Sequence, residues 1–253
     1  GAEKFLDIKC RKAGLKPSAV VVVATVRALK SHGGVAKADL SSENVEAMEK
    51  GMGNLFKHCE NMREVYNLPV IVAVNRFASD TGREIARLVE ACEARGIQAV
   101  PCNVWGEGGA GAIELAKAVC AVVDENENPG MTFAYPLEES YEQKIRHICE
   151  RIYGAKRIQF GAGVLSQLAQ LERDGYDGLP VCMAKTQYSL SDDPRKIGRP
   201  EDFEMTIRSV RLSAGAGFVV AFTGEIIAMP GLPKTPAANA IDIDKDGNIV
   251  GLF

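Results

Sequence analysis

Three apolar runs of this sequence each end in side chains that can bind ligands. These side chains are cations, an amide and two aromatic rings: Arg27 and Lys30 after residues 20–26, Asn75 and Phe77 after residues 68–74, and Trp105 after residues 97–102. Guanidinium and ammonium groups bind phosphate and carboxylate oxygens, and two aromatic rings can hold a flat ring system between their faces. Core packing for the rings and a structural salt bridge for the cations are alternatives of equal weight.

The runs that precede these residues read as strands of a parallel sheet. They are rich in β-branched residues, which is typical of strands buried on both faces. Helical patterns separate them: one begins at Ser41-Ser42-Glu43, one at a capping box of Thr81 and Glu84, and one at residue 112. The order βαβαβα predicts right-handed crossovers. Ligands bind such sheets at the carboxyl ends of the strands, so we expect these side chains at one edge.

A glycine-rich stretch after the third strand supports a rival hypothesis. Residues 106–111, GEGGAG, match GxGxxG between a strand and a helix, a pattern typical of dinucleotide-binding folds. That pattern requires an acid at the end of the next strand, whereas Asp124 and Glu125 stand in a polar linker with no strand before them. A dinucleotide-dependent oxidoreductase that uses Gly106 and Gly108 is therefore the weaker hypothesis. The glycines are expected to form a turn or to let the backbone approach a ligand.

A polar segment at residues 125–129 divides the chain into two predicted domains, 1–127 and 128–253. The first is an α/β domain with a parallel βα sheet layer. The second reads as a smaller α+β domain, with helical patterns at residues 138–153 and 164–173. Its strands are expected to form a mostly antiparallel sheet and lie at residues 179–184, 205–212, 218–227 and 240–253.

Two polar segments of the second domain are candidate ligand-binding loops. Lys185 and Thr186 leave a strand within AKTQYSLS, and Lys234 lies in the proline-rich PGLPKTP. Ordered loops that carry Lys and Thr often hold anions, and proline reduces the entropy lost when a loop becomes ordered. Solvated loops are the alternative. Residues 242–247 imitate the start of a calcium loop, but no helices flank them, so a hairpin turn is predicted instead.

Composition excludes several classes of function. The 253 residues carry a net charge of −3 with a pI of about 5.8, so no basic field exists for nucleic acid. No apolar run has the length of a membrane helix. Seven widely spaced cysteines predict free thiols in a reducing cytoplasm, and three scattered histidines predict no metal site. The chain lacks an initiator Met and is expected to be a fragment or a processed segment.

Six motifs together resemble one enzyme family. They are VATVRALKSHGG at residues 23–34, AVNRFASDT at 73–81, VWGEGGAGA at 104–112, PVCMAKTQYSLS at 180–191, MPGLPKTPAA at 229–238 and the terminal NIVGLF. In this order they are similar to formate–tetrahydrofolate ligases, and the similarity spans essentially the whole chain. The sequence resembles the carboxyl-terminal half of these enzymes.

The resemblance implies an ATP-dependent ligase that makes 10-formyltetrahydrofolate from formate and tetrahydrofolate through formyl phosphate. Folate is then expected to stack between Phe77 and Trp105. Mg²⁺ accompanies ATP, and a monovalent cation is a further candidate. The resemblance also offers candidate contacts for the nucleotide, a phosphate or an interface: Arg27, Lys30, Asn75, Gly106, Gly108, Lys185, Thr186 and Lys234.

Some functional parts of the family are missing from this sequence. It contains no GxxxxGK[ST] loop, and the family's catalytic lysine and its arginine for formyl phosphate have no counterpart here. We therefore expect the segment alone to be inactive and to need the amino-terminal half as its partner. The resemblance further implies a homo-oligomer, a tetramer in the family. A non-catalytic binding module is the remaining alternative.

Overall fold

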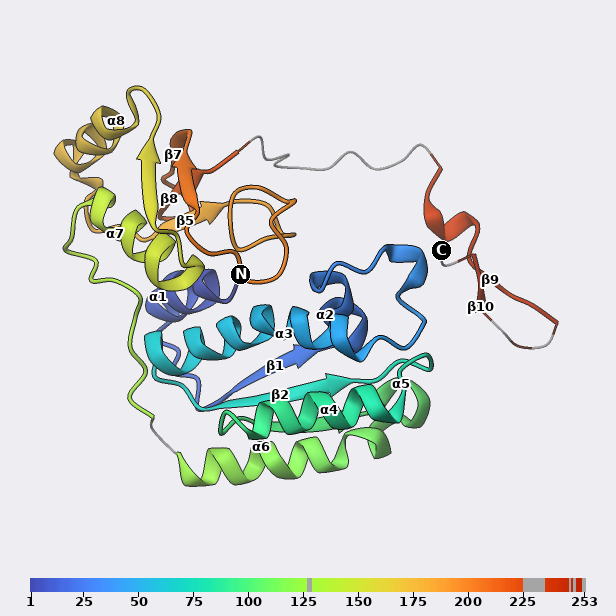
Figure 1. The fold of residues 1–253 in the computed structure, drawn as a ribbon. Coiled ribbons are helices and arrows are strands. Elements are labelled where there is room, and N and C mark those ends of the chain that lie inside the picture. Colours follow the sequence, from blue (N-terminus) through green and yellow to red (C-terminus); the bar gives the residue numbers. More distant parts are fainter. Residues whose placement is uncertain (127–128, 225–234, 246, 248, 252–253) are drawn as a thin grey trace.

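The computed structural model describes residues 1–126, 129–224, 235–245, 247 and 249–251. A parallel sheet with its helices forms one part of the molecule, and a second assembly of strands and helices lies beside the amino-terminal helix (Figure 1). Strands and helices alternate from β1 (Val20–Ala24) to α6 (Ile113–Glu125), whereas β5 (Val181–Ala184) to β8 (Phe218–Phe222) follow one another with no helix between them. The predicted α/β class is confirmed.

The parallel sheet has the order β1-β2-β3. Its strands are β1 (Val20–Ala24), β2 (Val70–Asn75) and β3 (Gln98–Cys102). The register pairs Ala24 with Val74 and Asn75 with Cys102, so the three strands end close together at one edge. This is the arrangement that the βαβαβ order predicts.

Helices cover both faces of this sheet. They are α2 (Val26–His32), α3 (Val45–Glu60) with its extension η3 (Asn61–Val65), α4 (Gly82–Glu93) and α6 (Ile113–Glu125). Val72 and Val74 of β2 share a buried cluster with apolar residues of α2, α3 and α4. Because side chains alternate along a strand, the buried Ile71 and Ala73 point to the other face, where α6 contacts β2 and β3.

The first strand ends earlier than the sequence predicts. β1 stops at Ala24, and the Thr25 hydroxyl caps helix α2 by accepting a hydrogen bond from the Ala28 N–H at 3.1 Å. Arg27 and Lys30 therefore lie on a helix rather than on a strand end. Threonine is a preferred capping residue, and this signal inside VATVRALKSHGG was overlooked because the apolar run continues through Val26.

Two glycines allow α2 and α3 to pack unusually closely. A Cβ atom on Gly33, just after α2, would lie 1.8 Å from the Ala47 carbonyl oxygen. A Cβ atom on Gly51 of α3 would lie 1.9 Å from the Leu29 carbonyl oxygen. Both distances fall far inside van der Waals contact, so only glycine fits at these two crossings. The SHGG end of the motif therefore has a packing role.

The second assembly contains two further sheets. Its helices are α7 (Tyr141–His147), continued by η5 (Ile148–Tyr153), and α8 (Val164–Leu171), continued by η6 (Glu172–Tyr176). Its strands are β4 (Arg157–Phe160), β5 (Val181–Ala184), β6 (Glu204–Ile207), β7 (Ser209–Ser213) and β8 (Phe218–Phe222). A short pair, β9 (Asp242–Ile243) and β10 (Ile249–Val250), follows near the end of the chain.

The pairing of these strands corrects the expectation of a mostly antiparallel sheet. β4 pairs with β6 and β5 with β8 in parallel, whereas β7–β8 and β9–β10 are antiparallel. Long stretches of chain separate β4 from β6 and β5 from β8, and they allow the chain to return before it pairs, as parallel pairing requires. β7 and β8 are joined by a tight turn, which forces the antiparallel pairing. The β9–β10 pair confirms the predicted hairpin, and Gly247 donates to the Asp244 carbonyl at 3.0 Å.

The amino-terminal helix packs into the core of the second assembly. It comprises η1 (Lys4–Cys10) and α1 (Arg11–Ala13). Leu6 and Cys10 share a buried cluster with residues of α7, η5, α8, β5 and β8. The buried Asp7 carboxylate accepts from the Tyr66 hydroxyl at 2.7 Å and from the Ala134 N–H at 3.0 Å. Segments from both sides of the predicted 127/128 boundary thus build this core, and that boundary stays a prediction.

The close helix crossing makes a stability prediction. Gly51→Ala should lower the free energy of unfolding by about 3 kcal/mol, because the added methyl group forces α2 and α3 apart. This loss should exceed the gain in helix propensity, about 1 kcal/mol. Chemical denaturation measures the net change in the free energy of unfolding.

The matched control is Gly82→Ala in the first turn of α4, where an added Cβ meets nothing within 4 Å. This control should be neutral or slightly stabilising. Equal stability of the two variants would contradict the steric role of Gly51.

Candidate ligand-binding edge of the parallel sheet

Two aromatic side chains stand exposed at the carboxyl edge of the parallel sheet. Phe77 follows β2 and is 46% exposed, and Trp105 follows β3 and is 82% exposed. The Arg76 N–H donates to the Cys102 carbonyl at 3.1 Å, so the two loops leave the sheet side by side. Such exposure is incompatible with a core-packing role for Trp105. The structure therefore brings the two predicted rings to one edge and leaves both open to solvent.

The loop that carries Phe77 is fixed by its own hydrogen bonds. The Asp80 carboxylate accepts from the Phe77 N–H at 2.9 Å, and the Asp80 N–H donates to the Phe77 carbonyl at 3.0 Å. Asp side chains commonly close turns in this way. The backbone that carries the ring is thus held in place before any ligand arrives, which lowers the entropy lost on binding.

The glycine-rich stretch shapes the loop that presents Trp105. Trp105 lies on α5 (Val104–Glu107), and η4 (Gly108–Ala112) follows. The Asn103 N–H donates to the Gly111 carbonyl at 3.0 Å, and a Cβ on Gly111 would lie 2.3 Å from the Asn103 oxygen. Gly108 has φ +59°, a left-handed conformation that favours glycine. A Cβ on Gly106 would lie 2.8 Å from the side-chain nitrogen Nδ2 of Asn103.

Two polar candidates lie at the same edge. The Arg27 guanidinium, in the first turn of α2, is 5.9 Å from the centre of the Phe77 ring and donates to the Ser41 hydroxyl at 3.4 Å. Asn75 is the last residue of β2 and is half-buried. Arg27, Asn75, Phe77 and Trp105 therefore form one group, which we call the sheet-edge site.

Lys30 does not belong to the sheet-edge site. Its side chain and that of Glu84 are both 0% exposed, with 3.0 Å between Lys30 Nζ and Glu84 Oε1. Lys30 also donates to the Ser42 carbonyl at 2.9 Å. The ammonium group is therefore enclosed and paired, which corrects its assignment as a candidate for phosphate binding. It forms a salt bridge between α2 and α4.

Glu84 gathers several hydrogen bonds around this ion pair. Burial by itself raises the pKa of its carboxyl group, but the N–H groups of Asn44 and Thr81, together with the Lys30 ammonium, lower that pKa below its usual value. The two N–H groups donate at 2.9 Å and 3.1 Å. The capping box of Thr81 and Glu84 is confirmed. The same carboxylate neutralises Lys30, a pairing for which the sequence carries no local signal.

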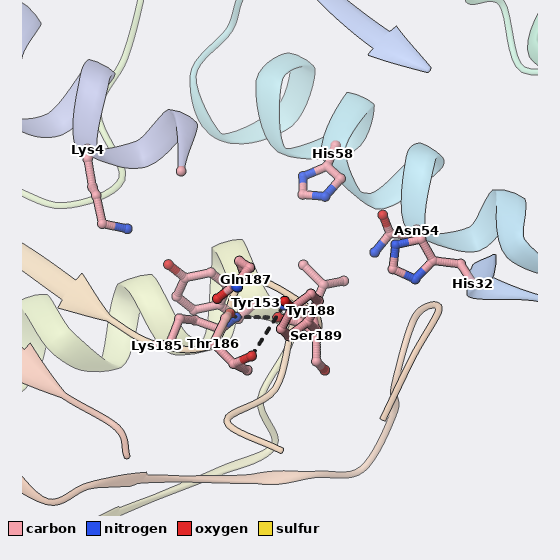
Figure 2. A pocket seen from close by; sticks show the side chains of 12 residues that line it. Lys4, His32, Asn54, His58, Tyr153, Lys185, Thr186, Gln187, Tyr188 and Ser189 are labelled. Carbon is pink, nitrogen blue, oxygen red and sulfur yellow. Dashed lines mark hydrogen bonds between the residues drawn. The ribbon is translucent and has the colours of Figure 1, made fainter. Parts of the chain in front are cut away.

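The remaining predicted residues lie elsewhere. Lys185 and Thr186 follow β5 and line a cavity of about 270 Å³ that shares no residue with the sheet-edge site (Figure 2). Lys234 lies outside the described residues. The structure thus brings four of the candidates together at the sheet edge and places Lys185 and Thr186 at a separate location.

Comparison with known families decides the class of protein. A family model for formate–tetrahydrofolate ligase matches residues 1–253. The chain belongs to the formate–tetrahydrofolate ligase family. The family catalyses ATP-dependent ligation of formate to tetrahydrofolate in one-carbon metabolism, so ATP, formate and tetrahydrofolate are the small molecules that it implies.

Membership in the formate–tetrahydrofolate ligase family fits the geometry of the glycine stretch. In a dinucleotide fold the glycines would lead into the first turn of a long helix after an inner strand. Here β3 is the last strand of its sheet in the described part of the chain, and a short α5 and η4 precede α6. The glycines have local roles in this ligase, as a turn and at close backbone contacts.

The described residues contain neither a metal-binding cluster nor a membrane-spanning helix. No group of three or more His, Cys, Asp or Glu side chains in that part of the ligase chain is placed to hold a metal ion. Within the same residues, no helix has both the length and the apolar character needed to cross a membrane.

The buried ion pair makes a second stability prediction. Lys30→Met should lower the free energy of unfolding by about 3–5 kcal/mol, because it leaves the Glu84 carboxylate buried without a countercharge. Lys30→Met combined with Glu84→Gln should recover a large part of this loss. Chemical denaturation of the four proteins of the double-mutant cycle measures the coupling.

A loss below about 1 kcal/mol in Lys30→Met would contradict this assignment, since surface ion pairs contribute no more than that. Lys117→Met is the surface control, because Lys117 and Glu114 form an exposed pair on α6.

Proposed function

We propose that this chain supplies the folate-binding part of an enzyme that makes 10-formyltetrahydrofolate from formate, ATP and tetrahydrofolate. The pteridine and aminobenzoate rings of the folate would stack between Phe77 and Trp105. One observation carries the proposal: two exposed aromatic side chains follow adjacent parallel strands and lie at the same sheet edge. Ligands of open parallel sheets bind at this edge.

Physical chemistry favours a flat aromatic ligand at this position. Trp105 is 82% exposed, so a stacked ring would remove a large apolar area from water on both partners. Stacking on an aromatic side chain contributes about 1–3 kcal/mol per ring. Arg27, beside Phe77, places a positive charge where an anionic group of a substrate would lie.

The proposed reaction proceeds through formyl phosphate. A formate oxygen attacks the terminal phosphorus of ATP, and the bond from that phosphorus to the bridging oxygen of ADP breaks. The N10 amine of tetrahydrofolate then attacks the formyl carbon, phosphate leaves and N10 loses its proton. The role of this chain is to hold the folate so that N10 faces the formyl group, which makes the second step effectively unimolecular.

Mg²⁺ would accompany the phosphates of ATP in this reaction. Such ions are usually held by one or two carboxylates together with substrate phosphates. In the described part of the chain, no group of three or more His, Cys, Asp or Glu side chains is placed to hold a metal ion. We therefore assign no Mg²⁺ ligand and no monovalent cation ligand to these residues.

We also propose that the amino-terminal half of the enzyme covers β1. This strand is at the edge of its sheet in the described structure, and its residues Val21 and Val23 are 38% and 66% exposed. A strand composed of valines and an alanine is typical of strands buried on both faces, and an open strand edge offers unpaired backbone groups to another strand. The phosphate-binding loop would come from that half, so the chain alone is expected to be inactive. A homo-oligomer remains part of this proposal.

Trp105 provides a direct test of folate binding, because it is the only tryptophan of the chain. Adding tetrahydrofolate should quench its fluorescence in a saturable way. Phe77→Ala should weaken this binding about ten-fold, which corresponds to about 1.4 kcal/mol. NADH in the same titration should give no saturable quenching.

The control is Tyr176→Ala, which removes an exposed aromatic ring from the second assembly and should leave the affinity unchanged. Absence of saturable quenching in a folded chain would favour a non-catalytic module or a site that needs the other half.

A kinetic test uses the complete enzyme. Trp105→Ala should raise the KM for tetrahydrofolate about ten-fold or more, with little change in the KM for ATP, because only the stacked folate rings lose a contact. Trp105→Phe should restore most of the affinity. An unchanged KM for tetrahydrofolate would refute the folate assignment, whatever the isolated chain binds.

A further inference from the structure

The cavity lined by Lys185 and Thr186 lies where the two parts of the molecule meet. Its volume is about 270 Å³, near the lower end of ordinary ligand pockets. One wall comes from His32 at the end of α2 and from Asn54 and His58 of α3, and the opposite wall comes from residues 185–190 and Tyr153 (Figure 2). Gly1 and Lys4 complete the lining. None of the residues of the sheet-edge site is among the lining residues.

Lys185 is the central cation of this cavity. Its ammonium group donates to the Thr186 carbonyl at 2.7 Å and to the Ser189 carbonyl, and it lies 5.0 Å from the centre of the Tyr153 ring. Three donors are present on a lysine ammonium, so one remains for a ligand. Lys185 forms no salt bridge with any residue in the described part of the chain. Burial lowers its pKa to about 8, so it is mainly charged at neutral pH.

The wall formed by α2 and α3 also presents hydrogen-bond donors. His32 Nδ1 accepts a hydrogen bond from the Gly198 N–H at 3.0 Å. The proton of the neutral imidazole is therefore on Nε2, the other ring nitrogen. Burial lowers the pKa of His32 below its usual value, which favours this neutral form. The Asn54 amide donates to the Gly198 carbonyl at 2.9 Å, so both side chains are anchored to the same residue of the second assembly.

The loop that carries Lys185 is ordered by its serines. The Ser189 hydroxyl bonds to the Lys196 carbonyl at 2.5 Å, and the Ser191 N–H donates to the Ser189 oxygen at 2.9 Å. The Arg199–Glu60 salt bridge, at 2.7 Å, ties the end of this segment to α3. The cavity is therefore formed before a ligand binds, and little ordering entropy is lost on binding.

The charges around the cavity select the class of ligand. Three residues that carry ammonium groups line it, Gly1 at the amino terminus, Lys4 and Lys185, and Glu3 pairs with the first two at 3.2 Å and 2.7 Å. No carboxylate side chain lines it, while hydroxyl and imidazole groups do. A phosphate group carries several acceptor oxygens and two negative charges, and ammonium groups in a partly enclosed site bind such anions well.

We propose that this cavity is a binding site for a phosphate group, held by Lys185 and Lys4 with help from His32, and separate from the sheet-edge site. The ligand is either inorganic phosphate or the phosphate end of a larger molecule. Because its walls come from both parts of the molecule, the bound anion would stabilise their contact. This inference does not depend on where folate binds.

The test is isothermal titration calorimetry of the 253-residue chain with inorganic phosphate, ADP and acetate. Inorganic phosphate should bind saturably with a Kd below about 1 mM, and acetate should bind much more weakly. Lys185→Met should weaken phosphate binding at least ten-fold. The matched control, Lys156→Met, removes an exposed lysine that is paired with Asp202 and should change nothing.

The ADP arm distinguishes the two ligand sources. If ADP binds and competes with phosphate, the site takes the phosphate end of a nucleotide. If phosphate binds and ADP does not compete, the site is for the free anion. Either result supports a phosphate site, whereas no phosphate binding by the folded chain, or wild-type affinity in Lys185→Met, would overturn it.

A second test does not depend on whether Lys185→Met folds. It measures the sulfate affinity of the unsubstituted chain at several pH values. Sulfate keeps its charge from pH 7 to pH 9.5, so a change in affinity reports on the protein. Affinity should fall at least three-fold as the pH rises through about 8, because Lys185 loses its proton. The other titratable groups around the cavity are the Gly1 amino group, Glu3, Lys4, His32, His58, Tyr153, Tyr188 and Asp192. A sulfate affinity that stays constant over this range would count against Lys185 as the anion-binding group.

Discussion

The buried salt bridge between Lys30 and Glu84 is the interaction on which the sheet-edge site depends. Both side chains are fully enclosed, and such a pair is tolerated only where hydrogen bonds satisfy both partners. Here the carboxylate also accepts from the N–H groups of Asn44 and Thr81. One carboxylate therefore fixes the end of α2, the entry to α3 and the start of α4. Arg27 lies in the first turn of α2, and the loop that carries Phe77 leads into α4.

Close packing of α2 on α3 reinforces this constraint. Gly33 and Gly51 let the helices approach until backbone meets backbone, and an interior packed so tightly cannot shift without loss of many contacts. At the sheet edge, by contrast, the side chains of Phe77, on a loop, and Trp105, on the short helix α5, are exposed to solvent. A rigid interior thus supports two open rings. This combination would suit the proposed stacking of a flat substrate between the two rings, because the site would not need to rearrange.

The junction of the two parts of the molecule is held by contacts between distant segments of the chain. Gly198 is held by His32 and Asn54, and the amino-terminal helix enters the second core through Leu6 and Cys10. These contacts join segments that lie far apart in the chain. They also leave a small cavity whose lining includes lysines but no carboxylate side chain. The same contacts that hold the parts together therefore create the conditions for an anion site.

Sequence alone determined the family, the α/β class, the order of strands and helices in the first part, and the two rings at the sheet edge. Each of these depends on local signals, such as β-branched runs, the capping box of Thr81 and Glu84, and motifs that follow one another in order. The parallel pairing of β4 with β6 and of β5 with β8 was not visible in this way, because pairing depends on how a long connection returns in space.

Only the tertiary structure decided what each cation does. Arg27 and Lys30 are three residues apart in one motif, yet Arg27 lies beside the Phe77 ring and Lys30 is buried against Glu84. Lys185, like Arg27 and Lys30, is a cation that follows an apolar run, but it lines a cavity at the junction of the two parts of the molecule. Sequence specifies that a charge is present and roughly where a strand ends. Which partner neutralises the charge, and whether water reaches it, depends on residues that folding brings together from distant positions.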